Sequence, residues 1–229
     1  IIKLNDLVKL GLKSVLIFGI PNNKGIKGAL DGIVHSAVKQ IKANLSTLEI
    51  ITDVCLCSYT ENGQCHIGDN DNTCELLAEI ALSHVNAGAD VVAPSDMMDG
   101  RVYYINKILK ENNLSTPVMS YAAKFASNYY GPFRHAADCS PQSGDRKSYQ
   151  MDYCNRLEAI DEVIEDIEEG AKSIIIKPAL SYLDIIRDVK DKIDLPVIGY
   201  NVSGEYKMIY ESVKQGWASE DLINETIIS

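Results

Sequence analysis

Short apolar segments alternate along the chain with longer segments in which apolar residues recur every three or four positions. The short segments are typical of buried strands, and the longer ones are typical of amphipathic helices. We expect strands at 14–18, 48–52, 90–94, 117–121, 172–177 and 195–200, each followed by a helix. Because no two strands are joined by a hairpin signal, this alternation predicts a parallel sheet in an α/β fold.

The expected helices have apolar positions at a helical period. They lie at 4–10, 31–42, 75–87, 102–111, 155–169, 180–192, from the turn at 201–206 to about 216, and at 220–228. The polar segment 22–28 and the long polar segment 126–152 contain no expected helix or strand. A loop as long as 126–152 is usually functional or disordered.

Two folds are compatible with this alternation, an open doubly wound sheet and a (β/α)8 barrel. Neither the dinucleotide motif GxGxxG nor the phosphate-binding motif GxxxxGK[ST] follows an expected strand. Residues with reactive or ionisable side chains instead lie just past the carboxyl ends of several strands: Asp53, Cys55, Asp96, Lys124, Lys177 and Ser203. That distribution favours a TIM (β/α)8 barrel with its active site at one end. We expect residues 1–229 to form a single barrel domain that lacks the first and the last of the eight strands.

The composition excludes several classes of protein. The 229 residues are 46% hydrophobic, enough for a sizeable core, and the net charge of −10 disfavours binding to nucleic acid or to anionic membranes. No run of about 18 apolar residues is present, so we expect no membrane span. The absence of an export signal predicts a cytoplasmic protein. Its six cysteines are then expected to be reduced thiols or metal ligands rather than disulfides.

Three cysteines lie within eleven positions, directly after an expected buried strand. Cys55 and Cys57 share one face because side chains alternate along an extended chain, and the turn at 62–63 allows Cys65 to fold back toward them. Three thiolates suit a divalent ion, usually zinc. Packing of buried cysteines explains the spacing equally well, because the spacing matches none of the paired CxxC zinc patterns. We interpret the remaining cysteines, which fit no ligand spacing, as structural: Cys74, Cys139 and Cys154.

Lys124 and Lys177 each follow an apolar strand, where a solvated lysine is uncommon. If both enter a partly dry barrel mouth, desolvation and mutual repulsion favour neutral amines. A neutral amine attacks a ketone to form a Schiff base. For a single lysine, extension into solvent or pairing with an acid such as Asp96 or Asp99 is the better explanation. Two such lysines beside a cysteine cluster favour chemistry.

The 126–152 segment offers Arg134, Arg146, Lys147 and Gln150. Arginine side chains bind carboxylates in bidentate fashion, so this segment is suited to clamp an acidic small molecule. A solvated cationic loop explains the same residues equally well when the segment is considered alone.

Several motifs together resemble the delta-aminolevulinic acid dehydratase family, also called porphobilinogen synthases. They are spread in order along nearly the whole chain: DVCLC at 53–57 with Cys65, APSDMMDGR at 93–101, MSYAAKF at 119–125, YGPFR at 130–134, GDRKSYQMD at 144–152, IKP at 176–178 and YNVSGEY at 200–206. A set of this extent is far more specific than any one motif.

The resemblance implies a barrel enzyme, a lyase of tetrapyrrole and heme biosynthesis, that condenses two 5-aminolevulinate molecules to porphobilinogen with loss of two waters. It implies that Lys124 and Lys177 each form a Schiff base with one substrate. It also implies that the active-site zinc of the zinc-dependent branch is held by three thiolates: Cys55, Cys57 and Cys65. The substrate-binding residues that it implies are Arg134, Arg146 and Gln150 for one carboxylate, Ser203 for the other, and Asp53, Ser95, Asp96 and Tyr130 along the pocket.

The resemblance also implies features outside the active site. Glu162 aligns with a ligand of an allosteric magnesium ion found in many bacterial members, although a solvated helix surface explains this residue as well. The family's octamer, assembled through an N-terminal arm that has no counterpart in this sequence, predicts a homo-octamer, with a hexamer as the alternative.

Two other functions stay open. Another Schiff-base aldolase of the barrel class would form one lysine adduct and need no thiolate zinc. A metal-binding or regulatory homologue would keep the fold without turnover.

Overall fold

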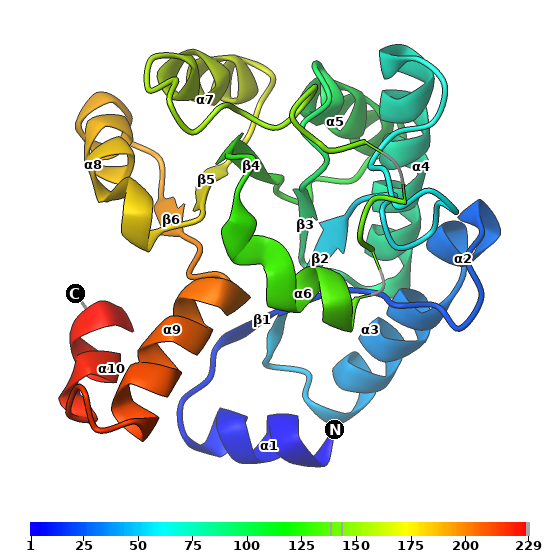
Figure 1. The fold of residues 1–229 in the computed structure, drawn as a ribbon. Coiled ribbons are helices and arrows are strands. Elements are labelled where there is room, and N and C mark those ends of the chain that lie inside the picture. Colours follow the sequence, from blue (N-terminus) through cyan, green and yellow to red (C-terminus); the bar gives the residue numbers. More distant parts are fainter. Residues whose placement is uncertain (138, 143, 228–229) are drawn as a thin grey trace.

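Six parallel strands in two three-stranded sheets form the centre of the molecule (Figure 1). This computed structural model describes residues 1–137, 139–142 and 144–227. The first sheet has the order β1 (Ser14–Ile17), β2 (Glu49–Val54), β3 (Val91–Pro94), and the second has the order β4 (Met119–Lys124), β5 (Ser173–Lys177), β6 (Val197–Gly199). An isolated parallel bridge between Val92 and Val118 links the two sheets. No pairing joins β1 to β6 within the described ranges, so the strands curve without closing a ring.

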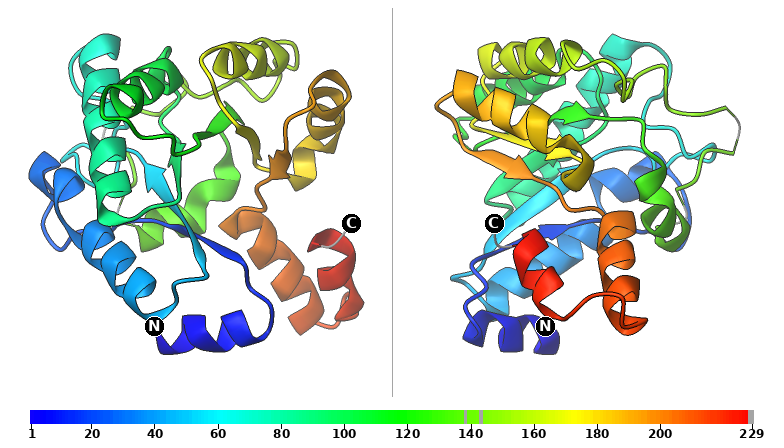
Figure 2. Two further views of the ribbon diagram at one scale, coloured as in Figure 1. Left: turned by 180° about the vertical axis from the view of Figure 1, so that it is seen from behind. Right: turned by 60° about the vertical axis from the view of Figure 1, so that its left-hand side comes forward.

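The helices lie mainly on the outside of the strands (Figures 1 and 2). They are α1 (Ile2–Lys9), α2 (Ile26–Leu30), α3 (Ile33–Asn44), α4 (Asn70–Ala87), α5 (Arg101–Glu111), α6 (Gly131–Ala136), α7 (Glu158–Glu168), α8 (Leu183–Lys192), α9 (Ser203–Lys214) and α10 (Asp221–Ile227). Two short 3-10 helices, η1 (Asn128–Tyr130) and η2 (Leu180–Tyr182), precede α6 and α8. The expected alternation of strand and helix is therefore present in all six repeats.

Both faces of the central strands β2 to β5 are largely buried, which explains why their sequences are mostly apolar rather than alternating. One face packs against the helices; Ile50 and Ile174, both 0% exposed, lie on this side. The other face forms an inner cluster to which every strand contributes: Leu16, Ile51, Val91, Ala93, Met119, Tyr121, Ile175 and Ile198. Because one cluster draws on all six strands, the two sheets face a common interior.

The polar segments contain more structure than their sequences predict. Part of segment 22–28 begins α2, and the 126–152 segment contains η1 and α6. The expectation of no helix there was wrong because α6 has only six residues, too few to show a helical period. Pro132 starts this helix, and Phe133 packs edge-on against Phe18 with ring centroids 5.2 Å apart. Tertiary contact therefore fixes a helix that is too short for the sequence pattern to reveal.

Helix α4 also begins five residues earlier than the pattern indicates. The side chain of Asp69 accepts a hydrogen bond from the backbone N–H of Asn72 (2.9 Å), which caps the first turn. Gly88, with φ of +111°, ends the helix in the left-handed conformation. Residue 228 of the expected last helix lies outside the described residues.

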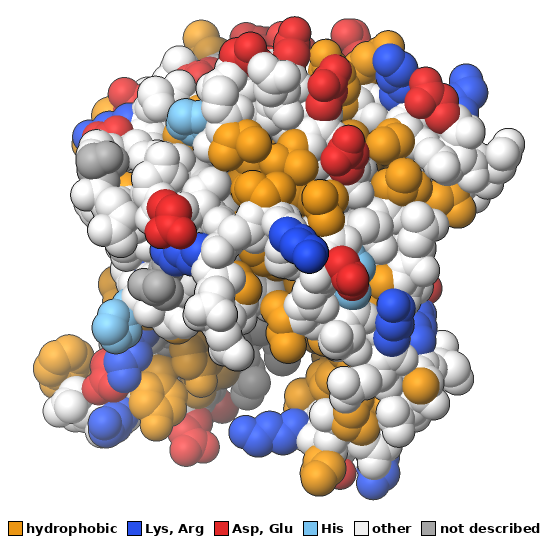
Figure 3. Space-filling view, turned by 90° about the vertical axis from the view of Figure 1, so that its right-hand side faces the viewer, with side chains coloured by type: hydrophobic (Ala, Val, Ile, Leu, Met, Phe, Trp, Pro, Cys, Tyr) orange, Lys and Arg blue, Asp and Glu red, His pale blue; other side chains and the backbone are white. Residues whose placement is uncertain are grey.

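The surface over α2 to α4 exposes hydrophobic side chains in patches between charged ones (Figure 3). Ile33 at the start of α3, for example, is 52% exposed. None of the described helices combines the length and the apolar character that crossing a membrane requires.

Candidate active site

A cavity opens where the carboxyl ends of the six strands meet. Each strand contributes to its lining: Phe18 after β1, Asp53 in β2, Ser95 after β3, Lys124 in β4, Lys177 in β5 and Tyr200 after β6. The carboxyl ends of parallel strands lie at one edge, so side chains far apart in sequence converge there. This is the position at which the sequence predicts the reactive residues.

Two buried lysines lie side by side in this cavity. Lys124 ends β4 and Lys177 ends β5, and the register of the two strands pairs these residues directly. Their exposed fractions are 5% and 7%. The ammonium group of Lys124 donates a hydrogen bond to the backbone oxygen of Ser95. Strand register, rather than any local motif, therefore brings the two amines together.

Aromatic rings surround the amine of Lys177. Its Nζ lies 4.2 Å from the ring centroid of Tyr200 and 5.0 Å from that of Tyr121. Three further ring centroids, those of Phe18, Tyr130 and Phe133, lie between 5.5 and 5.8 Å away. Burial, followed by repulsion from Lys124, lowers the pKa of Lys177 to about 7, while Asp53 acts in the opposite direction. Near neutral pH this amine is therefore uncharged in a large part of the molecules.

Asp53 lies at the carboxyl end of β2, in the same cavity as both lysines. Loss of contact with water raises the pKa of its carboxyl group, and Ser95 and the two lysines oppose that effect. A carboxyl group with a raised pKa beside a neutral amine is suited to exchange protons with a bound molecule.

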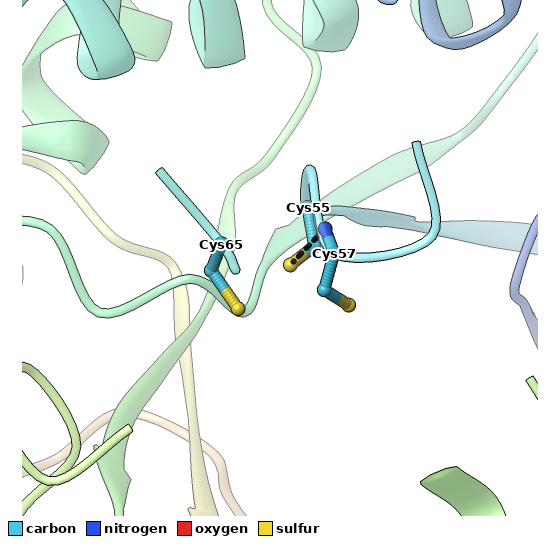
Figure 4. A group of neighbouring side chains, drawn as sticks. All are labelled: Cys55, Cys57 and Cys65. Atoms are coloured by element: carbon cyan, nitrogen blue, oxygen red, sulfur yellow. Dashed lines mark hydrogen bonds between the residues drawn. The ribbon is translucent and has the colours of Figure 1, made fainter. Parts of the chain in front are cut away.

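Three thiols form a compact group (Figure 4), and two of them share the cavity lining with the lysines. Cys55 and Cys57 follow β2, and Cys65 comes from the loop that returns toward them; the three sulfur atoms lie within 4.8 Å of one another. The backbone N–H of Cys57 donates to the sulfur of Cys55 at 3.5 Å. All three side chains are buried. The structure thus brings together the cysteines that the sequence proposes as a metal site.

The chemistry of this group fits a thiophilic ion. A hydrogen bond with Cys139, the largest cause, together with a bond to Cys55 and burial, raises the pKa of Cys57 well above that of an ordinary thiol. Without a cation these buried sulfurs therefore hold protons that a metal ion would displace. Three thiol groups so close together form a donor set suited to a thiophilic metal ion.

Polar side chains of the 126–152 segment cover the cavity from one side. Arg134 and Arg146 both line it, and the guanidinium of Arg134 lies 5.4 Å from the ring centroid of Tyr130. Arg146 donates to the backbone oxygens of Gly63 (2.8 Å) and Cys139 (2.5 Å). Two cationic groups therefore face the same cavity as the lysines, which suits an anionic ligand.

Tyr130 and Ser203 also line the cavity and support its wall. The hydroxyl of Tyr130 donates to the backbone oxygens of Phe125 (2.8 Å) and Lys177 (3.1 Å). The hydroxyl of Ser203 accepts from the backbone N–H of Phe133 (3.0 Å), which ties α6 to the start of α9.

Four of the expected site residues are not among those that line this cavity: Cys65, Asp96, Gln150 and Glu162. Asp96 follows Ser95, and because side chains alternate along an extended chain, Asp96 points into the core when Ser95 faces the cavity. There its Oδ1 lies 4.0 Å from Nε of Arg101, and burial raises its pKa to about 6. Asp96 is therefore not among the residues that line the cavity in this structure.

Gln150 and Glu162 lie in neighbouring hollows. Gln150, 2% exposed, lines a hollow that it shares with Arg134 and Arg146. Glu162 lines a different hollow with Asp99. Burial, the largest cause, raises the pKa of Glu162 to about 7. Glu162 is thus not among the residues that line the cavity.

Several residues at the site were not predicted from the sequence. Phe18 and Tyr200 occupy strand ends just as the lysines do, so their position was a usable signal for the aromatic wall. Cys139 offered no signal, because it lies far along the chain from the other thiols and at no ligand spacing. Interpreting Cys139 as merely structural overlooked its contact with Cys57.

Comparison with known proteins identifies the family. A family model described as delta-aminolevulinic acid dehydratase matches residues 1–229. The chain belongs to the delta-aminolevulinic acid dehydratase family. Among its relatives, the delta-aminolevulinic acid dehydratase of Bacillus subtilis is 48% identical over 235 residues, covering 98% of this chain and 72% of that protein. That of Archaeoglobus fulgidus is 47% identical, covering 99% of this chain and 74% of that protein.

A solved member of the family has the same fold. The delta-aminolevulinic acid dehydratase (porphobilinogen synthase) of Toxoplasma gondii, crystallised with its reaction product porphobilinogen, superposes with a TM-score of 0.94 at 34% sequence identity. The superposition covers 97% of this chain and 68% of that one. The two sheets and the cavity between them therefore correspond to the architecture of an enzyme of this family.

Proposed function

We propose that this chain catalyses the reaction of its family, the condensation of two 5-aminolevulinate molecules to porphobilinogen with loss of two waters. It is then a hydro-lyase of tetrapyrrole biosynthesis. The observation that carries the proposal is the pair of buried lysines in register at one strand edge, beside three convergent thiols. The names of the relatives and the product bound to the Toxoplasma gondii enzyme agree with it.

The two lysines would each bind one substrate covalently. The neutral amine of Lys177 attacks the ketone of one 5-aminolevulinate, and Lys124 does the same for the other. Each ketone oxygen leaves as water, which accounts for both waters of the overall reaction. The resulting iminium groups are electrophilic and acidify the adjacent carbon, as carbon–carbon bond formation requires. Both substrates are held on neighbouring strands. Once a first bond joins them, the formation of the second bond between them is effectively intramolecular.

The polar residues around the lysines would bind and orient the substrates. Arg134 and Arg146 face the cavity and are suited to bind the carboxylate of the substrate on Lys124. Ser203 would bind the other carboxylate, and Asp53 would move protons at the carbon next to the iminium. Gln150 joins this set only if a bound substrate draws it out of its neighbouring hollow.

The thiols of Cys55, Cys57 and Cys65 would hold zinc. Bound there, zinc would supply a Lewis acid beside the reacting carbonyl groups. The same proposal includes a separate magnesium site at Glu162, which lines a hollow with other acidic groups.

The remaining features that the resemblance implies stay predictions. They are the closure of the two sheets into a (β/α)8 barrel of which this chain supplies six strands as one domain, assembly into a homo-octamer, and a cytoplasmic location.

Borohydride trapping tests the proposal. We expect the protein, incubated with 5-aminolevulinate and reduced with borohydride, to carry a covalent adduct on Lys177 or Lys124, located by peptide mass spectrometry. Lys147, which is exposed, is the matched control and stays unmodified. Without an adduct at either cavity lysine the proposal fails. An adduct together with zinc but without porphobilinogen would instead favour a homologue without turnover.

A further inference from the structure

Cys139 lies against the thiol group although it is distant from it in sequence. Its side chain is 0% exposed and belongs to one buried cluster with Cys55, Cys57 and Cys65. The thiols of Cys139 and Cys57 lie close enough to interact within this cluster. The group whose sulfurs all lie within 4.8 Å of one another does not include Cys139, so Cys139 must move closer to the group to share an ion with all three.

The backbone around Cys139 is tightly attached to the loop that carries Cys65. Arg146 bridges the two segments by donating to the backbone oxygens of Gly63 and Cys139 at 2.8 and 2.5 Å. A Cβ on Gly63, which has φ of +69°, would lie 2.6 Å from the backbone oxygen of Ser140. The glycine therefore permits a close backbone contact that positions Cys139 at the thiol group.

We propose that Cys139 is a fourth sulfur ligand of the metal ion held by Cys55, Cys57 and Cys65, and that it closes the coordination sphere while its segment lies on the Cys65 loop. This inference rests on the proposed function, which places a metal ion at these three cysteines. It adds a ligand and a closed resting state to that function.

The chemistry of the surroundings supports a closed, sulfur-rich site. Zinc with four thiolates is tetrahedral and has no open position, whereas catalytic zinc keeps one. Four thiolates leave a net negative charge on the site, and the guanidinium of Arg146, 5% exposed, lies beside Cys139 to offset it. Chemistry at the ion then requires Cys139 to leave.

Arg146 also links this release to the substrate. Its guanidinium donates to the backbone oxygens of Cys139 and Gly63. A substrate carboxylate that takes the same guanidinium competes with those bonds. Binding of the carboxylate therefore loosens the segment that holds Cys139 on the ion.

The test counts sulfur atoms around the metal. The full chain is purified under reducing conditions, loaded with zinc and measured by X-ray absorption, and loaded with cobalt(II) and measured by visible absorption. The variants are Cys139→Ser and, as a matched control, Cys154→Ser, which removes an exposed cysteine outside the cluster. We expect four sulfurs in the wild type and in Cys154→Ser, and three in Cys139→Ser.

Two further quantities should change in Cys139→Ser: the charge-transfer absorption of the cobalt-loaded protein and its affinity for zinc. In Cys139→Ser the sulfur-to-cobalt charge-transfer absorption falls by about one quarter, because one of four thiolates is lost. Zinc affinity in a competition titration falls by at least about tenfold in the same variant. Cys154→Ser leaves both quantities unchanged.

Three sulfurs in the wild-type protein would overturn the inference, even if Cys139→Ser failed to fold. A disulfide between Cys139 and Cys57 in the reduced, zinc-loaded protein would also overturn it. A wild-type protein that binds no zinc refutes the proposed metal function together with this ligand. Borohydride trapping at the lysines tests the rest of the proposed function separately.

Discussion

Two buried cations in this protein have opposite surroundings. Arg101, 1% exposed, donates to Asp166 (3.0 Å), to Ser120 (3.2 Å) and to the backbone oxygens of Tyr121 and Met98 (3.2 and 3.0 Å). Lys177, 7% exposed, makes no ion pair among the described residues. Aromatic rings and a second lysine surround it instead.

The difference separates a structural charge from a reactive one. A buried cation that is paired with carboxylates stays charged and ties elements together. A buried amine without an ion-pair partner gives up its proton and becomes a nucleophile.

The two clusters are also connected. Arg101 bonds to Ser120 and Tyr121 in β4, the strand that ends in Lys124, and to the loop after β3. The Arg101 cluster therefore holds in place β4, the strand that carries Lys124 into the cavity. Four changes test this contrast.

The largest effect is expected from Lys177→Met. Removing the amine removes one Schiff base, and we expect porphobilinogen formation to fall by on the order of 10⁴-fold. Folding stability should rise by about 1–3 kcal/mol, because an unpaired buried amine is replaced by an apolar side chain of similar length. Activity assays and urea unfolding measure the two quantities. A variant that loses stability instead would show that Lys177 has a structural role like that of Arg101.

Asp166→Ala should have the reverse profile. It leaves the buried guanidinium of Arg101 without its carboxylate, which typically costs about 3–5 kcal/mol of folding stability. The matched control is Asp191→Ala, which breaks the exposed ion pair with Arg187 and should cost less than about 1 kcal/mol. Urea unfolding of both variants gives the comparison, and equal losses would contradict the assigned role of the Arg101 cluster.

The pH dependence of trapping sharpens the description of Lys177. Its pKa of about 7 means that the neutral, reactive form increases about tenfold per pH unit below 7 and levels off above it. The initial rate of borohydride-trapped adduct formation should follow this curve. Lys124→Met removes a repelling charge and should move the midpoint to higher pH. A wild-type midpoint near that of a solvated lysine would refute burial as the cause of reactivity.

The effect that is smallest near neutral pH concerns His84, which is buried outside the cavity and packs edge-on against His35. Both ring nitrogens lack a hydrogen-bond partner among the described residues, and burial lowers the pKa of His84 to about 3. As pH falls below the ordinary histidine value, the unfolded chain gains a proton that the folded protein refuses. Stability is therefore lost by up to about 1.4 kcal/mol per pH unit between roughly pH 6 and pH 3.

His84→Phe should flatten this dependence in urea unfolding across pH. The exposed His135→Phe is its control and should leave the slope as it is. An unchanged slope in His84→Phe would show that another group titrates over this range.

The sequence by itself determined the succession of strands and helices and the candidate chemistry. Val- and Ile-rich segments bounded by polar turns give the strands, because both of their faces are buried. The same pattern places Lys124 and Lys177 at strand ends, and the eleven-residue spacing from Cys55 to Cys65 indicates the thiol group. The family resemblance then supplied roles that spacing alone left open.

Only the tertiary structure decided which of these residues meet. The register of β4 with β5 pairs the two lysines, and alternation along the chain after β3 turns Asp96 into the core. The approach of Cys139 to Cys57 depends on a backbone contact at Gly63 that no sequence period encodes. Local patterns determine secondary structure because they reflect which face of an element is buried. Contacts between distant segments depend on packing, which becomes defined only when the whole chain has folded.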